Sequence, residues 1–520
     1  MKGRKKPRTF CQMDKDNRKT RSIILLIILT TILVRSLLVY YSNYSADDSF
    51  ITFRYAENIA SGKGFVYNEG ERVLGTSTPL YTLLLALLVK LGLPIITLAR
   101  IINIGADCTT GTVIFLLLRE FKLGVATVAA FFYVLFPRVI VWSVSGMETS
   151  LYVLFTALSL YFYHKEDFDL TTLFLGLTIL TRMDGIILGL AILLDYVWRY
   201  KKIPVKIILG SFGVVLPWLI FSITYFGSPI PNSVAGKKAL YEGTMWETPK
   251  WRIFWEFLFL KTKTGWPLFA LSLAGVYRVL TKAKSYKIIV LWTFLYLFFF
   301  FFSETKIHMW YYVPFYLGYL SLAALGLGLV FEKAEEIWRK MLELSQIRTR
   351  IFPSLKILGI AFLSALCILV GLTYFRQMKH TFRAVAAEQV ALEGIHKGIG
   401  LWLLENTQPS DTVCAEDIGY MGYYSGRYIL DQDGLVSPQA IPFNENRNRL
   451  GLLEKYKPAY FVIGFAGPYF SQVIQSEWFE NYYKKQATFN EGSVNLDRAK
   501  ISLGDFDFHV CEYNIYKRIF

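Results

Sequence analysis

The sequence predicts an α-helical polytopic membrane protein that carries a C-terminal α/β domain. Hydrophobic residues make up 54% of the 520 residues and charged residues only 18%, and the mean hydropathy is +0.37. Such values are typical of integral membrane proteins. Apolar runs of near-spanning length recur as far as residue 375. After residue 376 the pattern changes to short, alternating helical and strand-like segments.

Residues 1–21 form a basic segment that we expect in the cytoplasm. Nine Lys and Arg residues precede Ser22, against Asp14 and Asp16. The basic residues of the whole chain cluster in short stretches between apolar runs. We therefore interpret the net charge of +16 as a topology signal and expect no nucleic-acid partner. The run 22–42 is longer than a signal-peptide core and lacks a small-residue cleavage site, so it should remain as a helix.

The transmembrane domain is expected over residues 22–376, with about eleven spans. Several of the runs are shorter than the ~20 residues that a perpendicular helix needs. The runs are residues 22–42, 98–118, 125–144, 149–163, 170–181, 186–198, 205–226, 265–280, 288–302, 309–331 and 353–375. A further run, 79–91, is interpreted as re-entrant or interfacial. If it spanned the membrane, the Lys- and Arg-rich connections would move outside, against the positive-inside bias.

This topology predicts a polar site on the outer face of a plasma membrane. The outer segments are residues 47–78, 143–148, 182–184, 227–263, 303–308 and everything after Arg376. Each places polar groups at a boundary where hydrocarbon would penalise them.

The C-terminal domain, residues 377–520, is expected on the same side. Strands are predicted at 412–415, 460–463 and 508–516, and helices at 385–404, 446–456 and around 470–482. None of the five cysteines has a metal-ligand or CxxC spacing. Cys414 and Cys511 lie in this domain and either form a disulfide or remain free.

The first outer segment begins with two adjacent acids, Asp47 and Asp48. Two carboxylates at the lip of a membrane are costly to desolvate and repel each other, so one should have a raised pKa and accept a proton, as a general base does. The alternative is a helix cap, because Ser45 and Asp48 match the capping-box spacing. An amphipathic segment and a glycine-punctuated polar loop follow, which together predict a shelf at the membrane surface.

Several motifs resemble the GT-C class of membrane glycosyltransferases. They are the acid pair with the following Ser-Phe-Ile-Thr-Phe-Arg-Tyr-Ala-Glu-Asn, the loop 62–75, Ser145-Gly-Met-Glu-Thr, Thr181-Arg-Met-Asp-Gly, Gly227-Ser-Pro-Ile-Pro-Asn-Ser with Lys237, and Ile418 to Arg427 with Asp431, Asp433 and Gly434. The nearest branch contains the mycobacterial terminal arabinofuranosyltransferase. The chain is more distantly similar to protein O-mannosyltransferases and lipid A aminoarabinose transferases. Met183 departs from the proline that relatives often have there.

The resemblance implies transfer of one sugar from a polyprenyl-phosphate donor to a glycan, lipid or protein acceptor outside the cytoplasm. It implies that an acid of the first outer loop, Asp47 or Asp48, is the catalytic base. The chemistry agrees, because an attacking hydroxyl must lose its proton. The leaving phosphate needs positive charge more than it needs an acid.

Candidates for binding the donor phosphate or sugar come from several outer segments: Arg54, Glu148, Arg182, Asp184, Lys237, Lys306 and His308. Each has a structural alternative. Arg182 either contributes charge or only pairs with Asp184, Lys237 is equally consistent with a solvated loop, and Glu148 suits a helix start without any function. His308 and the following Trp310, Tyr311 and Tyr312 are typical of an interfacial belt. The tail motif either recognises acceptor or, as we favour, packs against the membrane domain.

No cofactor is expected. Asp47, Asp48 and Glu148 are chemically able to chelate a divalent cation, but relatives with monophosphate lipid donors generally do not need one. Two other functions compete with the transferase: a transporter or flippase of lipid-linked glycans, for which Asp107 is the clearest intramembrane acid, and a non-catalytic glycan-binding membrane protein.

Overall fold

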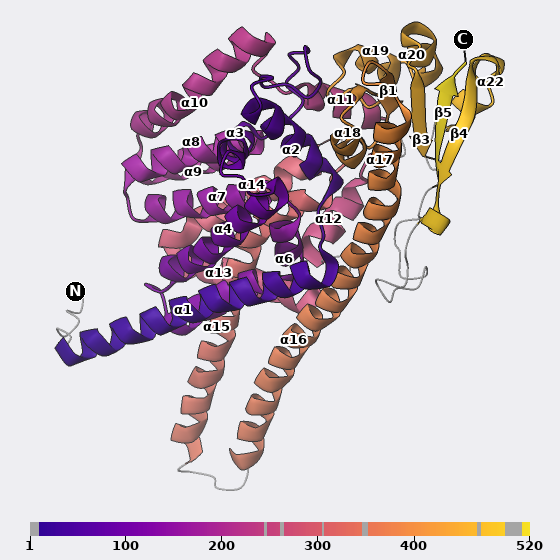
Figure 1. Ribbon diagram of the computed structural model, residues 1–520. Coiled ribbons are helices and arrows are strands. Elements are labelled where there is room, and N and C mark those ends of the chain that lie inside the picture. Colours follow the sequence, from indigo (N-terminus) through magenta and orange to yellow (C-terminus); the bar gives the residue numbers. More distant parts are fainter. Residues whose placement is uncertain are drawn as a thin grey trace.

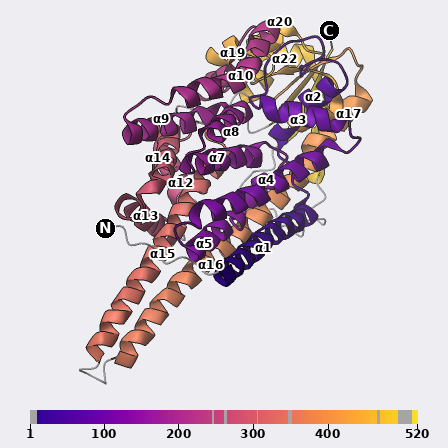
Figure 2. The ribbon, with the colours of Figure 1, turned by 90° about the vertical axis from the view of Figure 1, so that its left-hand side faces the viewer.

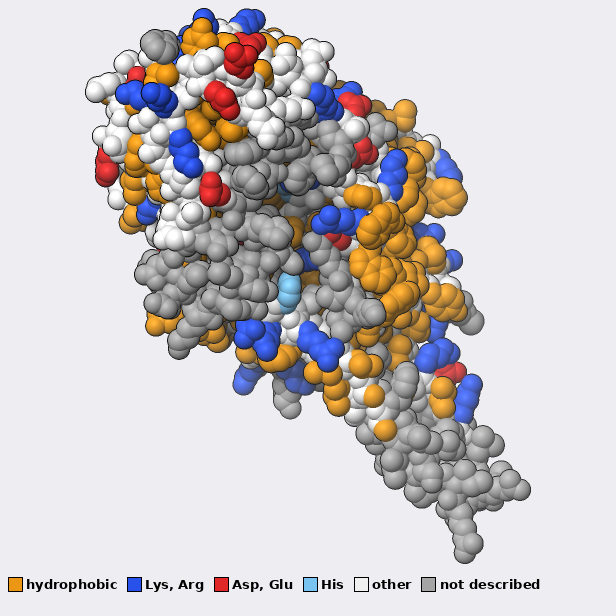
Figure 3. Space-filling view, turned by 90° about the vertical axis from the view of Figure 1, so that its right-hand side faces the viewer, with side chains coloured by type: hydrophobic (Ala, Val, Ile, Leu, Met, Phe, Trp, Pro, Cys, Tyr) orange, Lys and Arg blue, Asp and Glu red, His pale blue; other side chains and the backbone are white. Residues whose placement is uncertain are grey.

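A bundle of helices carries a mixed sheet at one end (Figure 1). The computed structural model describes residues 10–243, 247–259, 265–303, 306–345, 352–464, 470–493 and 512–519. The sheet and its helices lie at the upper end of the molecule, at about the height of α10, whereas α15 and α16 extend below the bundle (Figures 1 and 2). In the view of Figure 3, charged side chains of both signs are spread over the upper end, and exposed hydrophobic side chains gather lower down.

The bundle follows the apolar runs of the sequence closely. Its helices up to the middle of the chain are α1 (Phe10–Ser42), α2 (Asp47–Ala60), α3 (Pro79–Val89), α4 (Ile95–Leu118), α5 (Leu123–Val134), α6 (Pro137–Val144), α7 (Thr149–His164), α8 (Phe168–Thr181), α9 (Ile186–Tyr200) and α10 (Val205–Phe226). The later ones are α11 (Asn232–Tyr241), α12 (Lys250–Phe259), α13 (Trp266–Thr281), α14 (Lys287–Phe301), α15 (Tyr312–Ser345) and α16 (Phe352–Ala391).

Among the described residues, five helical segments are long and apolar enough to cross a membrane: Asn17–Ser42, Ile95–Leu118, Val205–Phe226, Lys284–Phe301 and Met309–Ile337. The expected span 125–144 is instead two helices, α5 and α6, bent by 53°. Pro137 explains the break, because proline lacks the amide that would continue a helix and begins the next one readily. If this bent pair counts as one span, the number is six, and the count of eleven stays a prediction.

The first loop contributes two helices. The described α3 has 11 residues and a length of about 17 Å, too short to cross ~30 Å of hydrocarbon. This length agrees with the expectation that residues 79–91 do not span. Helix α2 buries its apolar face, with Phe50, Phe53, Tyr55 and Ala56 fully enclosed.

The C-terminal part forms a five-stranded sheet of order β2-β1-β3-β5-β4. Strands β1 (Thr412–Ala415), β2 (Tyr428–Asp431) and β3 (Tyr460–Gly464) are parallel, whereas β4 (Tyr483–Phe489) and β5 (Tyr513–Arg518) join by antiparallel pairing. The helices of this part are α17 (Lys397–Asn406), α18 (Ile418–Ser425), α19 (Ile441–Glu445), α20 (Arg449–Tyr456), α21 (Phe470–Ile474) and α22 (Glu477–Tyr482).

The strands β1 and β3 occupy the expected residues, whereas sequence reasoning missed β2 and β4. The expected helix around 470–482 is split into α21 and α22, because Ser476 starts a new helix by capping the amide of Phe479. The helix expected over 385–404 is interrupted by a π-helical turn at Leu392–His396. Cys414 is buried and free, and Cys511 lies outside the described residues.

The sheet domain is joined to the first loop by side chains of that loop. Asn68 exchanges two hydrogen bonds with the backbone of Ile429 in β2 (2.8 and 3.0 Å), as though it were a further strand residue. The Tyr67 hydroxyl donates to the carbonyl of Ile418 (2.6 Å). On the other side, Asn232 at the start of α11 donates to the carbonyl of Gly434. Hydrogen bonds from the first loop and from α11 therefore join the two parts, next to an apolar cluster in which Tyr55 and Phe65 pack with Ile429.

Arg35 of α1 and Asp107 of α4 form a fully buried ion pair inside the bundle. The guanidinium donates two hydrogen bonds to Asp107 Oδ2 (2.6 and 2.9 Å) and one to the carbonyl of Val134 (2.7 Å), and both side chains are 0% exposed. The intramembrane acid that a transporter hypothesis would use is thus paired with an arginine, an arrangement that also serves structure alone.

Candidate active site

The acid pair opens α2, but it does not form the capping box. The N-cap residue is Ala46, and no side chain caps the first turn. The backbone amide of Ser45 donates to Gln389 instead (2.8 Å). The capping-box alternative is therefore wrong, because Ala46 is the N-cap residue and neither the Ser45 nor the Asp48 side chain caps the first turn.

Asp47 caps a different helix, α18 of the sheet domain. Its two carboxylate oxygens accept hydrogen bonds from the amides of Gly419 (3.0 Å) and Tyr420 (2.9 Å). His396, in the π-helical turn, places Nδ1 3.5 Å from Asp47 Oδ1. Burial opposes a charge on this histidine, but Asp47 and the nearby Asp417 outweigh it and raise its pKa. The amides at the start of α18 and the neighbouring His396 therefore hold the Asp47 carboxyl in place.

Asp48 does not take part in that contact. Within the described ranges it makes no hydrogen bond or ion pair with another side chain. Burial raises its pKa from 3.8 to about 6; the charge of Lys237 opposes this rise, and Asp47, Asp417 and Glu148 add to it. The two adjacent acids therefore differ. Asp47 is hydrogen-bonded to the start of α18, whereas Asp48 has a raised pKa.

Two lysines from separate segments interact electrostatically with Asp48. Lys237 lies on α11 and Lys306 in the segment before α15, and each acts electrostatically on the Asp48 carboxyl or is acted on by it. Lys237 Nζ sits 5.7 Å above the Trp310 ring and Lys306 Nζ 5.5 Å above the Tyr241 ring. Burial lowers the pKa of Lys306. An aromatic ring thus lies under each of the two ammonium groups.

His308 joins the same group. Its ring stacks on Trp310 at 4.4 Å and 11°, and Nε2 has no hydrogen-bond partner among the described residues. Burial, together with Lys237 and Lys306, lowers its pKa well below the ordinary value, so it is neutral at pH 7. Trp310 also meets Trp142 edge-on at 5.3 Å. His308, Trp310 and Trp142 thus pack together beside Lys237, and the interfacial belt that the sequence suggested stays a prediction.

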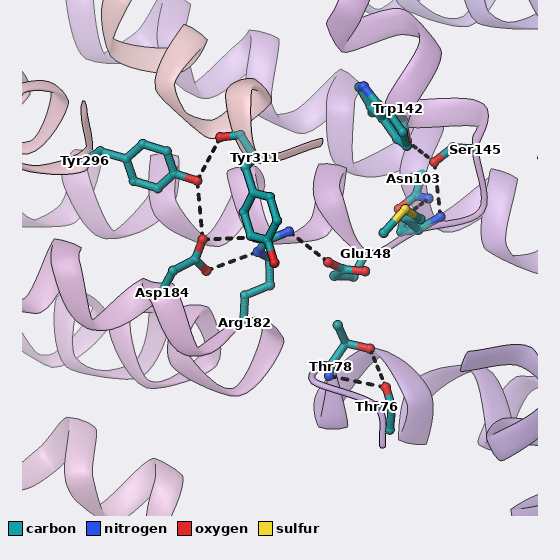
Figure 4. Close-up of polar contacts among 11 residues, drawn as sticks. Thr76, Thr78, Asn103, Trp142, Ser145, Glu148, Arg182, Asp184, Tyr296 and Tyr311 are labelled. Atoms are coloured by element: carbon teal, nitrogen blue, oxygen red, sulfur yellow. Dashed lines mark hydrogen bonds and ion pairs between the residues drawn. The ribbon is translucent and has the colours of Figure 1, made fainter. Parts of the chain in front are cut away.

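A second group is built on Arg182 (Figure 4). The buried guanidinium contacts Glu148 Oε1 at 3.1 Å and Asp184 with two bonds of 3.0 and 3.1 Å, and it lies 4.6 Å below the Tyr311 ring. The Tyr296 hydroxyl is within hydrogen-bond distance of both Asp184 Oδ2 (3.3 Å) and the carbonyl of Tyr311 (3.1 Å). The structure thus realises the Arg182–Asp184 pairing that was the structural alternative and adds Glu148 to it.

The loop that carries Glu148 depends on a glycine. Gly146 has φ +88°, and a Cβ there would come within 2.8 Å of Phe53 on α2. Its carbonyl accepts the Tyr81 hydroxyl (2.9 Å), and the carbonyl of Met147 accepts Asn103 (2.7 Å). Only glycine tolerates both the conformation and the close approach, which explains the Ser-Gly-Met-Glu motif physically.

Arg54 does not reach this site. Its guanidinium donates to the carbonyls of Tyr67 (2.9 Å), Gly422 (2.6 Å) and Arg427 (2.7 Å), and it stacks 4.2 Å from the Tyr67 ring. These contacts tie the first loop to the sheet domain, so the structure gives Arg54 a joining role in place of the expected phosphate contact.

Sequence reasoning missed three residues that the tertiary structure adds: His396, Asp417 and Asp433. Asp417 is an exposed residue with left-handed backbone (φ 47°) just before α18, and its carboxylate contacts the Tyr513 hydroxyl. Asp433 pairs with Arg449 at 2.7 Å. Both acids act electrostatically on Lys306. A local signal existed only for Asp433, which lies in the tail motif.

The described part of the chain contains no group of three or more His, Cys, Asp or Glu side chains suited to holding a metal ion. Asp47, one of the three candidate ligands, is bonded to backbone amides. The described arrangement is therefore one base candidate, two ammonium groups and a neutral imidazole. This set is able to accept a proton and to stabilise an anion.

Comparison with known proteins bears on the fold. Residues 381–511 match a family described as a domain of unknown function, DUF8728, and no curated protein matches the chain. Among solved structures, ArnT from Cupriavidus metallidurans bound to undecaprenyl phosphate is similar at TM-score 0.60 and 12% identity, with 95% of this chain and 97% of ArnT covered.

The oligosaccharyltransferase AglB from Archaeoglobus fulgidus, solved with an inhibitory peptide and a dolichol-phosphate, is similar at TM-score 0.54 and 13% identity, over 94% of this chain and 75% of AglB. These neighbours are GT-C glycosyltransferases with polyprenyl-phosphate ligands. At such identities the likeness concerns architecture, and by its architecture the chain has the GT-C membrane fold.

Proposed function

We propose that this protein is a glycosyltransferase that moves one sugar from a polyprenyl-phosphate donor to an acceptor hydroxyl, with Asp48 as the general base. The observation that carries the proposal is the raised pKa of Asp48, about 6, in a carboxyl that interacts electrostatically with Lys237 and Lys306. The neighbours in fold, which were solved with undecaprenyl or dolichol phosphate, support the donor class.

The reaction is one displacement. The acceptor oxygen forms a bond to the anomeric carbon, and the bond from that carbon to the phosphate oxygen breaks. The electron pair of the broken bond leaves on the polyprenyl phosphate, while the hydroxyl proton passes to the Asp48 carboxylate. A base with a pKa near 6 is ionised at neutral pH and still accepts a proton in the transition state. A single displacement inverts the anomeric configuration.

Positive charge for the leaving phosphate comes from Lys237 and Lys306. They lie on different segments and are supported by Trp310 and Tyr241, so a phosphate between them gains two charge-assisted contacts as its charge grows. His308, neutral and with Nε2 unpartnered among the described residues, offers one further hydrogen bond. The Glu148–Arg182–Asp184 group shapes the adjoining wall and presents carboxylate oxygens to sugar hydroxyls.

We place the reaction on the outer face of the plasma membrane, with the N-terminus in the cytoplasm and the sheet domain outside. The clustering of Lys and Arg before Ser22 supports this orientation. The acceptor is a glycan, lipid or protein of the cell envelope. The motif resemblance favours the branch of the mycobacterial terminal arabinofuranosyltransferase.

The test is transfer by the purified chain in lipid nanodiscs, given radiolabelled polyprenyl-phosphate sugars and a glycan acceptor. Asp48→Asn should lower transfer by roughly 10²–10⁴, the usual contribution of a general base. Glu69→Gln removes an exposed carboxylate of the same loop, whose ion-pair partner within the described residues is Lys63 at 3.2 Å, and should leave transfer unchanged. Parallel reactions with EDTA or Mg²⁺ test metal dependence.

Full transfer by Asp48→Asn would overturn the assignment of the base. Movement of intact donor across vesicles, with no cleavage in any reaction, would replace the transferase with a transporter.

A further inference from the structure

A cavity that the proposed reaction does not use lies where the first loop, α4 and the sheet domain meet. Its volume is about 140 Å³, below the ~300–1,000 Å³ of pockets for drug-sized ligands, so it suits one small unit. Ser45, Phe50 and Arg100 line it from the membrane domain, and Glu393, Lys397 and Tyr424 from the other side.

We propose that this cavity is a carbohydrate subsite that holds one uncharged sugar ring of the acceptor glycan, next to the reacting unit. The assignment of the sugar to an acceptor rests on the proposed transferase function, whereas sugar binding in the cavity does not.

Aromatic rings provide the first argument. Tyr420 packs on Phe50 with ring centroids 3.9 Å apart and stacks with Tyr424 at 5.9 Å and 23°. Phe50 and Tyr424 are 5.7 Å apart. Phe50 and Tyr420 are only 0% and 2% exposed, so they support the half-buried Tyr424, whose ring is the aromatic surface that this wall offers. The C–H face of a sugar ring is apolar and packs on aromatic surfaces, where it loses few hydrogen bonds to water.

The second argument concerns charge. Arg100 would attract an anion, but its guanidinium is occupied by protein acceptors. It donates to the side chain and carbonyl of Asn43 (both 2.8 Å), the carbonyl of Tyr44 (2.9 Å), Ser45 Oγ (3.2 Å) and the carbonyl of Val144 (3.4 Å). Little hydrogen-bonding capacity is left for a phosphate.

The other two charged side chains of the cavity have opposite signs. Glu393 and Lys397 are one helical turn apart and both line the cavity, so their net charge is zero. Glu393 accepts a bond from Gln389 (3.1 Å), and Lys397 lies 5.0 Å from the Tyr424 ring. A carboxylate and an ammonium together suit hydroxyl groups, which donate and accept at once. A neutral polyol fits this set better than a lipid phosphate does.

The position of the cavity links it to the reaction. Ser45 and Phe50 lie on either side of the acid pair in the sequence. The backbone amide of Tyr420 donates a hydrogen bond to Asp47 (2.9 Å). The Tyr420 hydroxyl also bonds the carbonyl of Ser45 (3.3 Å) and accepts from Gln389 (3.2 Å). A sugar on this wall therefore lies beside the residues that orient the start of α2.

The experiment is saturation-transfer NMR on the full chain in lipid nanodiscs, since the sugar headgroup of a maltoside detergent would compete. The probes are methyl α-D-mannopyranoside, methyl β-D-galactopyranoside and methyl α-D-arabinofuranoside. Tyr424→Ala and Lys397→Met should abolish the saturation of whichever probe binds, or weaken its binding at least about tenfold.

The chain offers a matched control outside the cavity, because Lys455 lies 5.4 Å from the Tyr456 ring in the same Lys–Tyr arrangement. Tyr456→Ala and Lys455→Met should leave the signal unchanged. Asp48→Asn should also keep it, so loss of transfer and loss of binding are read separately. Absence of saturation for all three probes, equal saturation in Tyr424→Ala and Lys397→Met, or displacement of the probe by inorganic phosphate would overturn the proposal.

Discussion

Asp47 accepts a hydrogen bond from the backbone amide of Tyr420 (2.9 Å), 373 positions further along the chain. A first-loop acid thus completes the start of α18 in the sheet domain, whereas its neighbour Asp48 interacts electrostatically with Lys237 and Lys306. Of two acids that look equivalent in the sequence, one positions the other.

Asp47→Ala should loosen the sheet domain without removing the base. Two charge-assisted hydrogen bonds from amides are lost, a cost of about 1–3 kcal/mol to the local stability of α18. Hydrogen exchange should quicken over Ile418–Ser425, and transfer should fall through a mispositioned Asp48. Glu69→Gln provides the comparison. Unchanged exchange in α18 would contradict the positioning role.

The pH dependence of transfer follows from the raised pKa of Asp48. Because burial holds this pKa at about 6, kcat/KM should fall about tenfold per pH unit below pH 6 and level off above it. Between pH 3.8 and 6 the folded state binds a proton that the unfolded state has released, so Asp48 costs stability as pH rises through this window. Asp48→Asn should therefore lose transfer yet unfold at an equal or higher temperature at pH 7.5. A profile without an acid limb near pH 6 would argue against Asp48.

Lys237→Met should move that acid limb. The Lys237 charge lowers the pKa of Asp48 against the effect of burial, so its removal raises the pKa and shifts the limb to higher pH. Donor phosphate binding should weaken at the same time, which raises KM. Lys238→Met is a suitable control, because Lys238 is exposed and near Glu242 (3.8 Å) on the same helix. An acid limb that stays at the same pH would show that Lys237 does not influence the pKa of Asp48.

Arg182→Ala should be strongly destabilising. It leaves Glu148 and Asp184, both buried, without a compensating charge, and breaking a buried ion pair costs about 3–5 kcal/mol. The triple variant Arg182→Met, Glu148→Gln, Asp184→Asn should recover much of the thermal stability but not the transfer activity. Recovery of both would make the group purely structural.

The Arg35–Asp107 pair distinguishes a structural from a transport role. Asp107→Asn should lower the unfolding temperature, since it leaves a buried guanidinium unpaired. The double variant Arg35→Met, Asp107→Leu should restore the temperature and retain sugar transfer in the nanodisc assay. Loss of transfer in a double variant that folds normally would show that the pair takes part in function.

The sequence by itself determined the membrane class, most helix positions and the segment that holds the acid pair. These features are local, because apolar length and periodicity within one segment are enough to set them. It also suggested the Arg182–Asp184 pair, whose members are only two residues apart.

Only the tertiary structure decided which acid of the pair binds α18 and which one interacts with the lysines. It also decided that Arg54 joins the first loop to Gly422, and it brought His396 and Asp417 to the site. Each of these depends on contacts between residues hundreds of positions apart, such as Asp47 with Tyr420. No local pattern encodes such a contact, because the energy that selects it arises only when α18, α11 and the first loop have already packed together.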